Sequence, residues 1–112
     1  MFDTKWSPGE KKVAHAAFEA ALSRERAAIR RHIEAMLSVS AEGPEIWAIR
    51  DYLNEKAREF DHKYDFRYSV LIDVFARLLA EGWLTLDELA GLDTSKLELV
   101  RNRSAMWKVN DA

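Results

Sequence analysis

The sequence has no cysteine and no long apolar run. The absence of cysteine rules out disulfides, thiolate metal ligands and a thiol nucleophile. The longest apolar runs are only a few residues, far short of the roughly 20 residues that a helix needs to span a bilayer. The amino terminus also lacks the apolar stretch of a signal peptide. We therefore expect a cytoplasmic protein without a membrane span.

An excess of charge of either sign is missing as well. Charged residues make up 32% of the 112 residues, but the formal net charge is only -2, and acidic and basic groups are interspersed. This balance gives no electrostatic field that would favour nucleic acid or an anionic membrane. The length fits one domain. We therefore predict a single domain, residues 1–112, that does not bind nucleic acid.

The groups that catalysis or metal binding requires are not assembled in the sequence. The histidines are scattered, and no two of them have the i, i+4 spacing of a helical metal site. They are His15, His32 and His62. The hydroxyl residues lack a nucleophile-elbow context, and the glycines form no phosphate-binding loop. We predict no metal, no cofactor and no catalytic residue, so the sequence does not support an enzyme.

The first predicted element is a long helix. Ser7, Pro8 and Glu10 place a hydroxyl at the N-cap, a proline at the first helical position and a carboxylate that returns a hydrogen bond to the cap. Apolar residues then recur at helical spacing as far as about Leu37, namely Val13, Ala14, Phe18, Ala21, Leu22, Ile29, Ile33, Met36 and Leu37. About thirty residues exceed the ~8 to 20 of common globular helices. In a small protein such a helix usually packs along a second chain, so we predict a dimer.

A turn and a second helix follow. The segment from Ser38 to Pro44 contains turn-forming residues, so we expect the chain to reverse there. The next helix has one apolar stripe, made of Ile46, Ile49, Leu53 and Phe60. Other residues follow one another at three- and four-residue spacings on a different side; they are Trp47, Asp51, Asn54, Glu55 and Arg58. This second helix therefore has two distinct faces.

The remainder of the chain is also predicted to be helical, which gives an all-α fold without strands. A third helix, from about Arg67 to Glu81, is apolar on one side, and Gly82 supplies its left-handed end. Two capping boxes predict two further short helices separated by Gly91; the boxes are Thr85 with Glu88 and Ser95 with Glu98.

Two aromatic features are candidates for binding. Trp47 lies away from the apolar stripe and close to Arg50 and Asp51, a composition that protein interfaces favour. The alternative is that Trp47 only packs in the core or in a dimer interface. The cluster from Tyr64 to Tyr68 places aromatics beside Asp65 and Arg67. For this cluster we favour packing at a helix corner over ligand binding, because buried tyrosines need polar partners.

Long motifs in the sequence resemble the fluorescence recovery protein family, known from cyanobacterial photoprotection. The motifs cover nearly the whole chain: Trp6-Ser7, Ala16-Ala17-Phe18, the stretch from Ile46 to Leu53, KYDFRYSVL from Lys63 to Leu71, and EGWLTLDELAGLD from Glu81 to Asp93. The resemblance implies an all-helical homodimer in which long helices of two subunits pack together, with a smaller helical head at each end. It also implies binding to the photoactivated orange carotenoid protein, chiefly its C-terminal domain. Binding would promote detachment from the phycobilisome antenna and faster return to the resting form.

The resemblance also implies a binding surface on the second helix. The family's tryptophan and aspartate fall on Trp47 and Asp51, while Arg50 stands where histidine is typical. Of a basic pair further on, Lys56 is retained, Ala57 replaces an arginine, and Arg58 offers a charge one residue later. The predicted partner-binding residues are thus Trp47, Arg50, Asp51, Lys56 and Arg58. Two further departures are Asp73, where an aromatic residue is frequent, and Leu99, where lysine is common, and the tail from Ser104 to Ala112 is additional.

Two other interpretations are open. The chain could be a divergent relative from an organism without phycobilisomes, in which the same scaffold binds a different protein. Alternatively, the dimer could be a small-molecule sensor or a minor enzyme whose pocket is lined by aromatic residues, namely Tyr52, Tyr64, Tyr68 and Trp83. A pocket with convergent polar groups would favour this last interpretation.

Overall fold

The computed structural model describes the backbone of residues 5–39 and 44–110, and the side chains of residues 5–39 and 46–107. The elements are α1 (Pro8–Val39), α2 (Pro44–Lys63), α3 (Leu71–Glu81), a 3-10 helix η1 (Leu86–Leu89) and α4 (Thr94–Asn110). These ranges contain no strand, so the predicted all-α fold is confirmed. None of the described helices is both long and apolar enough to cross a membrane.

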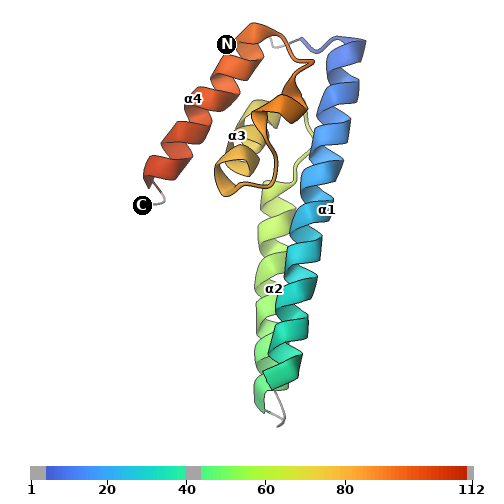
Figure 1. Cartoon of the computed structure of the whole chain (residues 1–112), viewed down its shortest axis with the longest axis vertical. Helices are drawn as coiled ribbons and strands as arrows, with labels where there is room; N and C mark the ends of the chain where they lie inside the picture. The colour runs from blue at the N-terminus through green and yellow to red at the C-terminus, as the bar shows by residue number, and fades with distance from the viewer. Residues whose placement is uncertain (1–4, 40–43, 111–112) are drawn as a thin grey trace.

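The molecule is elongated, with extents of 53 × 29 × 24 Å. In Figure 1, α1 runs the full length of the molecule, and α2 lies antiparallel beside its second half. We call this helix pair the stalk. The elements α3 and η1 lie beside the first half of α1, and α4 packs against α3 on the side away from α1; we call α3, η1 and α4 the head.

The beginning of α1 agrees with the prediction. The backbone N–H of Glu10 donates to the hydroxyl of Ser7 at 3.1 Å, and the N–H of Ser7 donates back to the Glu10 carboxylate at 3.0 Å. The helix continues two residues past the predicted end at Leu37, and Ser38 bonds the carbonyl of Ala35. Ser40 and Gly43 of the predicted turn lie outside the described residues. The following helix begins at Pro44, where proline is well suited to a first turn.

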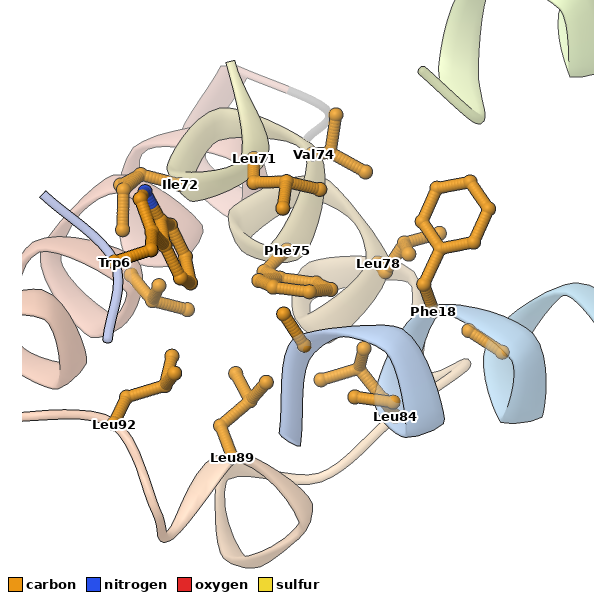
Figure 2. Packing of buried hydrophobic residues seen from close by; sticks show 14 residues of the cluster. Trp6, Phe18, Leu71, Ile72, Val74, Phe75, Leu78, Leu84, Leu89 and Leu92 are labelled. Carbon is orange, nitrogen blue, oxygen red and sulfur yellow. The ribbon is translucent and has the colours of Figure 1, made fainter. Parts of the chain in front are cut away.

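The hydrophobic core is located in the head. Phe75 lies in the middle of it, surrounded by residues of α1, α3 and the segment after α3 (Figure 2). The largest fully buried side chains are Phe75, Leu71, Leu78, Leu89 and Val100. Each such side chain contributes about 1.5–3 kcal/mol through burial. The first half of α1 completes the core with Ala14, Ala17, Phe18 and Ala21, so the stability of the head depends on α1.

The third helix begins later than predicted. It begins at Leu71 rather than Arg67, because the carbonyl of Arg67 accepts the N–H of Val70 and closes a turn instead. Its end at Gly82 is confirmed, since Gly82 has a φ of 86° and its N–H caps the helix. Only glycine adopts this left-handed conformation without strain.

One of the two predicted capping boxes in the last part of the chain is correct. Thr85 and Glu88 form a reciprocal box at the start of η1. The box assigned to Ser95 is wrong, because Ser95 already lies inside α4 and Asp93 is the cap. The Asp93 carboxylate accepts the N–H of Lys96 at 2.9 Å and the hydroxyl of Ser95 at 2.7 Å. The helix that follows has 17 residues and is therefore not short as predicted.

Candidate binding surface

The side chain of Trp47 is open to solvent near the free end of the stalk. Its exposed fraction is 60%, so it is not part of the core of this chain. The guanidinium of Arg50 lies 5.3 Å from the centre of the indole ring, within the range of a cation–π contact. Arg50 also donates to the Asp51 carboxylate from Nε at 3.1 Å and from Nη2 at 2.9 Å. The three side chains therefore form one contiguous group of an aromatic ring, a cation and an anion.

Arg58 shares this side of α2. At about 100° per residue, Asp51 and Arg58 point within about 40° of Trp47 on the helix, and both are exposed. We call the set Trp47, Arg50, Asp51 and Arg58 the tryptophan surface. Large aromatic and arginine side chains at an exposed helix face are typical of interaction sites.

Lys56 does not belong to the tryptophan surface. Nine residues after Trp47 it projects from the opposite side of α2, because nine steps of about 100° amount to half a turn beyond two full turns. Its ammonium lies 3.0 Å from the Glu59 carboxylate and 5.7 Å from the centre of the Tyr52 ring. The hydrogen bond from Lys56 to Glu59 raises the pKa of Lys56. Four of the five predicted binding residues thus lie on one side of α2, and the fifth lies on the opposite side.

Lys56 lines an open apolar groove between α1 and α2. The groove has a volume of about 290 Å³ and is lined by Arg26, Ile29, Leu53, Lys56, Ala57, Phe60 and Asp61. A second hollow of about 570 Å³ shares Arg26 and Ile29 with it and continues along α1 past Ile33. We call the two together the stalk groove. Isoleucine, leucine and phenylalanine side chains that face an open groove indicate a surface without its binding partner.

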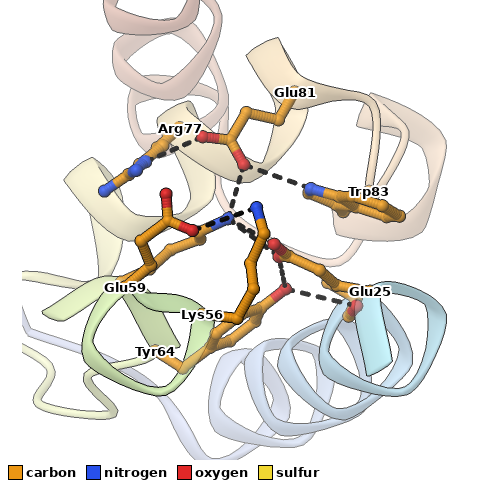
Figure 3. A network of polar contacts seen from close by, with 9 residues as sticks. Glu25, Lys56, Glu59, Tyr64, Arg77, Glu81 and Trp83 are labelled. Atoms are coloured by element: carbon orange, nitrogen blue, oxygen red, sulfur yellow. Dashed lines mark hydrogen bonds and ion pairs between the residues drawn. The ribbon is translucent and has the colours of Figure 1, made fainter. Parts of the chain in front are cut away.

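An ionic cluster around the buried side chains of Lys63 and Glu25 joins the stalk to the head (Figure 3). The ammonium of Lys63 donates to both carboxylate oxygens of Glu25, at 2.8 and 2.7 Å, and to Glu81 at 2.6 Å. Glu81 also accepts from Arg77 at 2.8 Å and from the indole N–H of Trp83 at 3.1 Å. Burial raises the pKa of Glu81, but the bonds from Lys63 and Arg77 outweigh it and hold the pKa below its usual range. We call these five residues the joint.

Sequence reasoning missed the joint, although one signal for it was present. Glu25 follows Ala14, Phe18 and Ala21 at spacings of four, three and four, so a carboxylate occupies a position of the buried stripe. A charge at such a position requires a buried partner of opposite sign. Which partner it has could not be read from the pattern, because Lys63 is far away in the sequence.

The aromatic segment before α3 forms a packed corner, as favoured from the sequence. The centre of the Phe66 ring lies 5.0 Å from that of Phe18 and 5.4 Å from that of Tyr68, in edge-to-face contacts. The Tyr64 hydroxyl lies 2.7 Å from Glu25, to which it donates. Burial and then this hydrogen bond to the carboxylate raise the pKa of Tyr64.

The four aromatic residues suggested for a small-molecule pocket have different neighbours. Tyr52 packs on the His32 ring at 4.5 Å, while Trp83 bonds Glu81. Tyr64 packs against Phe60 and Phe18, and Tyr68 packs against Trp6. The structure therefore does not arrange these rings around one pocket. Among the side chains of residues 5–39 and 46–107, no three histidine or acidic groups lie close enough together to hold a metal ion.

The head has a further hollow beside the last turns of α4. It has a volume of about 360 Å³ and is lined by Asp73, Arg103, Met106 and Trp107. Arg103 donates to Asp73 at 2.8 Å, and Arg77 lies 5.1 Å from the centre of the Trp107 ring. The charge of Asp73 is thus matched by an arginine from the neighbouring helix.

Comparison with known proteins accounts for this combination of stalk and head. The family model described as "Photoprotection regulator fluorescence recovery protein" matches residues 6–111, which include all five elements. The chain belongs to the fluorescence recovery protein family. It is 36% identical over 99 residues to the fluorescence recovery protein of Synechocystis sp. strain PCC 6803, covering 88% of this chain and 91% of the relative.

Solved structures of fluorescence recovery proteins have the same fold. The Fremyella diplosiphon protein superposes with a TM-score of 0.86 at 43% identity, over 91% of this chain and 100% of that chain. The Synechocystis protein gives a TM-score of 0.85 at 36% identity, over 90% and 99% of the two chains. The likeness therefore extends over both the stalk and the head. As a fluorescence recovery protein family member, the chain belongs among regulators of photoprotection.

Proposed function

We propose that this protein binds the photoactivated orange carotenoid protein, chiefly its C-terminal domain, and accelerates the return to the resting form, which ends antenna quenching. The observation that carries the proposal is the exposed Trp47, flanked by Arg50 and Asp51, in a chain that belongs to the fluorescence recovery protein family. The contact of a largely exposed tryptophan ring with water is unfavourable in free energy in the free protein. Its burial against a partner would recover that cost.

The mechanism in this proposal is differential binding without covalent chemistry. A protein with two states returns faster to one of them only if its regulator stabilises the barrier between the states more than it stabilises the activated state. Trp47 anchors the photoprotein, and Asp51, Arg50 and Arg58 orient it. The encounter takes place in the cytoplasm, and residues 1–112 act as one domain.

The proposal includes a homodimer formed through the stalk. The stalk groove exposes Leu53, which is 42% accessible, and is rimmed by charges of both signs from Arg26, Lys56 and Asp61. A second copy of the same stalk offers complementary apolar residues and both charge signs, as a two-fold interface requires. Lys56 would then contact the second copy, while the tryptophan surface on the other side of α2 stays available to the photoprotein.

The test is the dark recovery of photoactivated orange carotenoid protein, followed by its absorbance with and without this protein at a stoichiometric dimer concentration. Acceleration that the variant Trp47→Leu loses, with an unchanged far-UV circular dichroism spectrum, would support the proposal. No acceleration by a folded dimer, confirmed by light scattering, would refute it. Loss of helical signal in the variant would show that Trp47 has a structural role instead.

A second candidate function is binding of a different protein by the same dimeric scaffold, in an organism without phycobilisomes. The observation that favours it is the ion pair between Asp73 and Arg103, which makes the head charged where the family often has an aromatic residue. Arg50, Ala57 and Leu99 also differ from the residues that are typical of the family at these positions. A folded dimer that leaves the recovery rate unchanged would support this candidate.

A further inference from the structure

Two buried lysines each bind two carboxylates, and they lie at different places in the molecule. Lys96, which is 4% exposed, connects the start of α4 to Glu10 and Asp93 within the head. Lys63, which is 5% exposed, is the last residue of α2 and binds Glu25 of α1 and Glu81 of α3. Of these two lysines, Lys63 is therefore the one that joins the stalk helix α2 to α1 and α3.

The charges of the joint balance one another. Lys63 and Arg77 supply two cations, and Glu25 and Glu81 supply two anions. Every carboxylate oxygen of Glu25 and Glu81 accepts at least one hydrogen bond. Buried charges are tolerated only with such pairing, and charge-assisted hydrogen bonds are strict in distance and direction. The cluster therefore favours one relative placement of α1, α2 and α3.

Apolar packing fixes α2 much less firmly. Among its described side chains, residues 46–63, no apolar one is fully buried, and the buried side chain is that of Lys63. The groove of about 290 Å³ separates part of α2 from α1. Interdigitated apolar side chains usually set the angle between two helices. Within one chain, apolar packing contributes little to the angle between α2 and α1. The ionic contacts of the joint therefore have to set this angle.

We propose that Lys63 is a positioning residue, which sets the angle of α2 against α1 and α3 and thereby places the tryptophan surface. Trp47 lies sixteen residues from Lys63, or about 24 Å along the helix at 1.5 Å per residue. A change of about 10° at the joint would therefore displace Trp47 by about 4 Å. Displacements of this size remove a hot-spot side chain from its pocket on a partner.

The first test measures the angle directly and needs no partner. Because the chain has no cysteine, spin labels can be attached at Ala16→Cys on the head part of α1 and Asn54→Cys on α2, both exposed sites. Ala16 lies nine residues before Glu25 on α1, and Asn54 lies nine residues before Lys63 on α2, which is about 14 Å along the helix in each case. Pulsed electron–electron resonance, with unlabelled protein added in excess to suppress distances between chains, gives the distance distribution within one chain.

Lys63→Met is expected to shift or broaden this distribution, while Lys63→Arg, which keeps the charge, stays closer to the parent. Lys96→Met is the matched control, because it removes an equally buried lysine that does not touch α2, and it should leave the distribution unchanged. If Lys63→Met alone does not fold, the double variant Lys63→Met/Glu25→Gln is measured in its place, because it also removes the anion that would be left unpaired. A distribution identical to the parent in the folded variant would overturn the proposal.

The second test rests on the proposed function. Lys63→Met is expected to weaken the acceleration of photoprotein recovery by about threefold or more, the size of effect expected from a remote residue, and Lys96→Met is not. If the parent protein does not accelerate recovery at all, the proposed function fails. The spin-label distances still decide whether Lys63 positions α2, so the two failures are distinguishable.

Discussion

One carboxylate, that of Glu10, joins the N-terminal ends of α1 and α4. Its Oε1 accepts the backbone N–H of Ser7 at 3.0 Å. Its Oε2 accepts the N–H of Asp93 at 3.0 Å, although Glu10 and Asp93 are separated by 83 positions in the chain. The ammonium of Lys96 donates to both oxygens, at 3.3 and 3.1 Å. Glu10 therefore completes a local helix cap and at the same time fixes the position of α4 in the head.

Glu10→Gln should destabilise the head. The amide keeps one acceptor oxygen but loses the charge that matches Lys96, which stays buried. Loss of one partner of a buried ion pair typically costs about 3–5 kcal/mol, and because Asp93 and the carbonyl of Lys5 also accept from Lys96, we expect about 2–3 kcal/mol. Urea denaturation followed by circular dichroism measures the change. Glu19→Gln, at an exposed site of the same helix, is the control, and equal midpoints for the two variants would contradict the prediction.

Stability should fall in acid partly because of Glu88. The bidentate hydrogen bond from Arg24 and the N–H of Thr85 lower the pKa of Glu88 to about 2. Because the pKa is lower in the folded state than in the unfolded state, where it is about 4.3, the contribution is complete above about pH 4.3 and is lost as the pH falls toward 2. The free energy of unfolding, measured from pH 2 to 7, should therefore decline less steeply for Glu88→Gln in that range. An unchanged slope would contradict this prediction.

The ends of the helices show which parts of the fold are determined by residues close together in the sequence. The box of Ser7 with Glu10 and the glycine stop at Gly82 depend on residues within a few positions of one another, and both were predicted. The start of α4 was assigned wrongly because Asp93 and Ser95 are both good capping residues. The bond between the Asp93 N–H and Glu10 distinguishes them, and that contact cannot be read from the local pattern.

The candidate site shows the same division between local and distant contacts. The spacing of Trp47, Asp51 and Arg58 follows from helix geometry alone, so their common face could be predicted. The opposite orientation of Lys56 follows from the same geometry, but the resemblance to a family grouped it with the others. The joint depends on Glu25, Lys63 and Glu81 from three helices, and contacts of this kind need the tertiary structure.

Gly91 should tolerate no side chain. A Cβ atom at this position would overlap the side chain of Val13 on α1. Overpacking of this kind costs about 1–3 kcal/mol, so Gly91→Ala should lower the free energy of unfolding by that amount. Val13→Ala in the same chain should recover part of the loss. Gly9→Ala, where only the Ser7 hydroxyl lies near the added atom, is the control, and a Gly91→Ala protein as stable as the Gly9→Ala protein would contradict the argument.

Trp47 should contribute to binding but not to folding. Because its ring is 60% exposed, Trp47→Leu should change the free energy of unfolding by less than about 0.5 kcal/mol. A central tryptophan of an interface is worth about 2 kcal/mol, so the affinity for the photoprotein should fall about 30-fold. Size-exclusion binding and thermal unfolding measure the two effects. Trp107→Leu, at another exposed tryptophan, in α4, serves as the control with unchanged affinity. A Trp47 variant that binds as the parent does would show that Trp47 is not a binding residue.

Leu53 should decide whether two copies associate. It is 42% exposed and lines the stalk groove beside Ile29 and Phe60, so a second stalk would bury it. Leu53→Glu places a charge at the centre of that apolar contact, and an unpaired buried charge costs several kcal/mol. Light scattering should then give a monomer mass for the variant at micromolar concentration, with the helical content of the head retained. Asn54→Glu, one residue further on and turned about 100° away, should leave the mass unchanged. A dimer that survives Leu53→Glu would mean that the copies associate through another face.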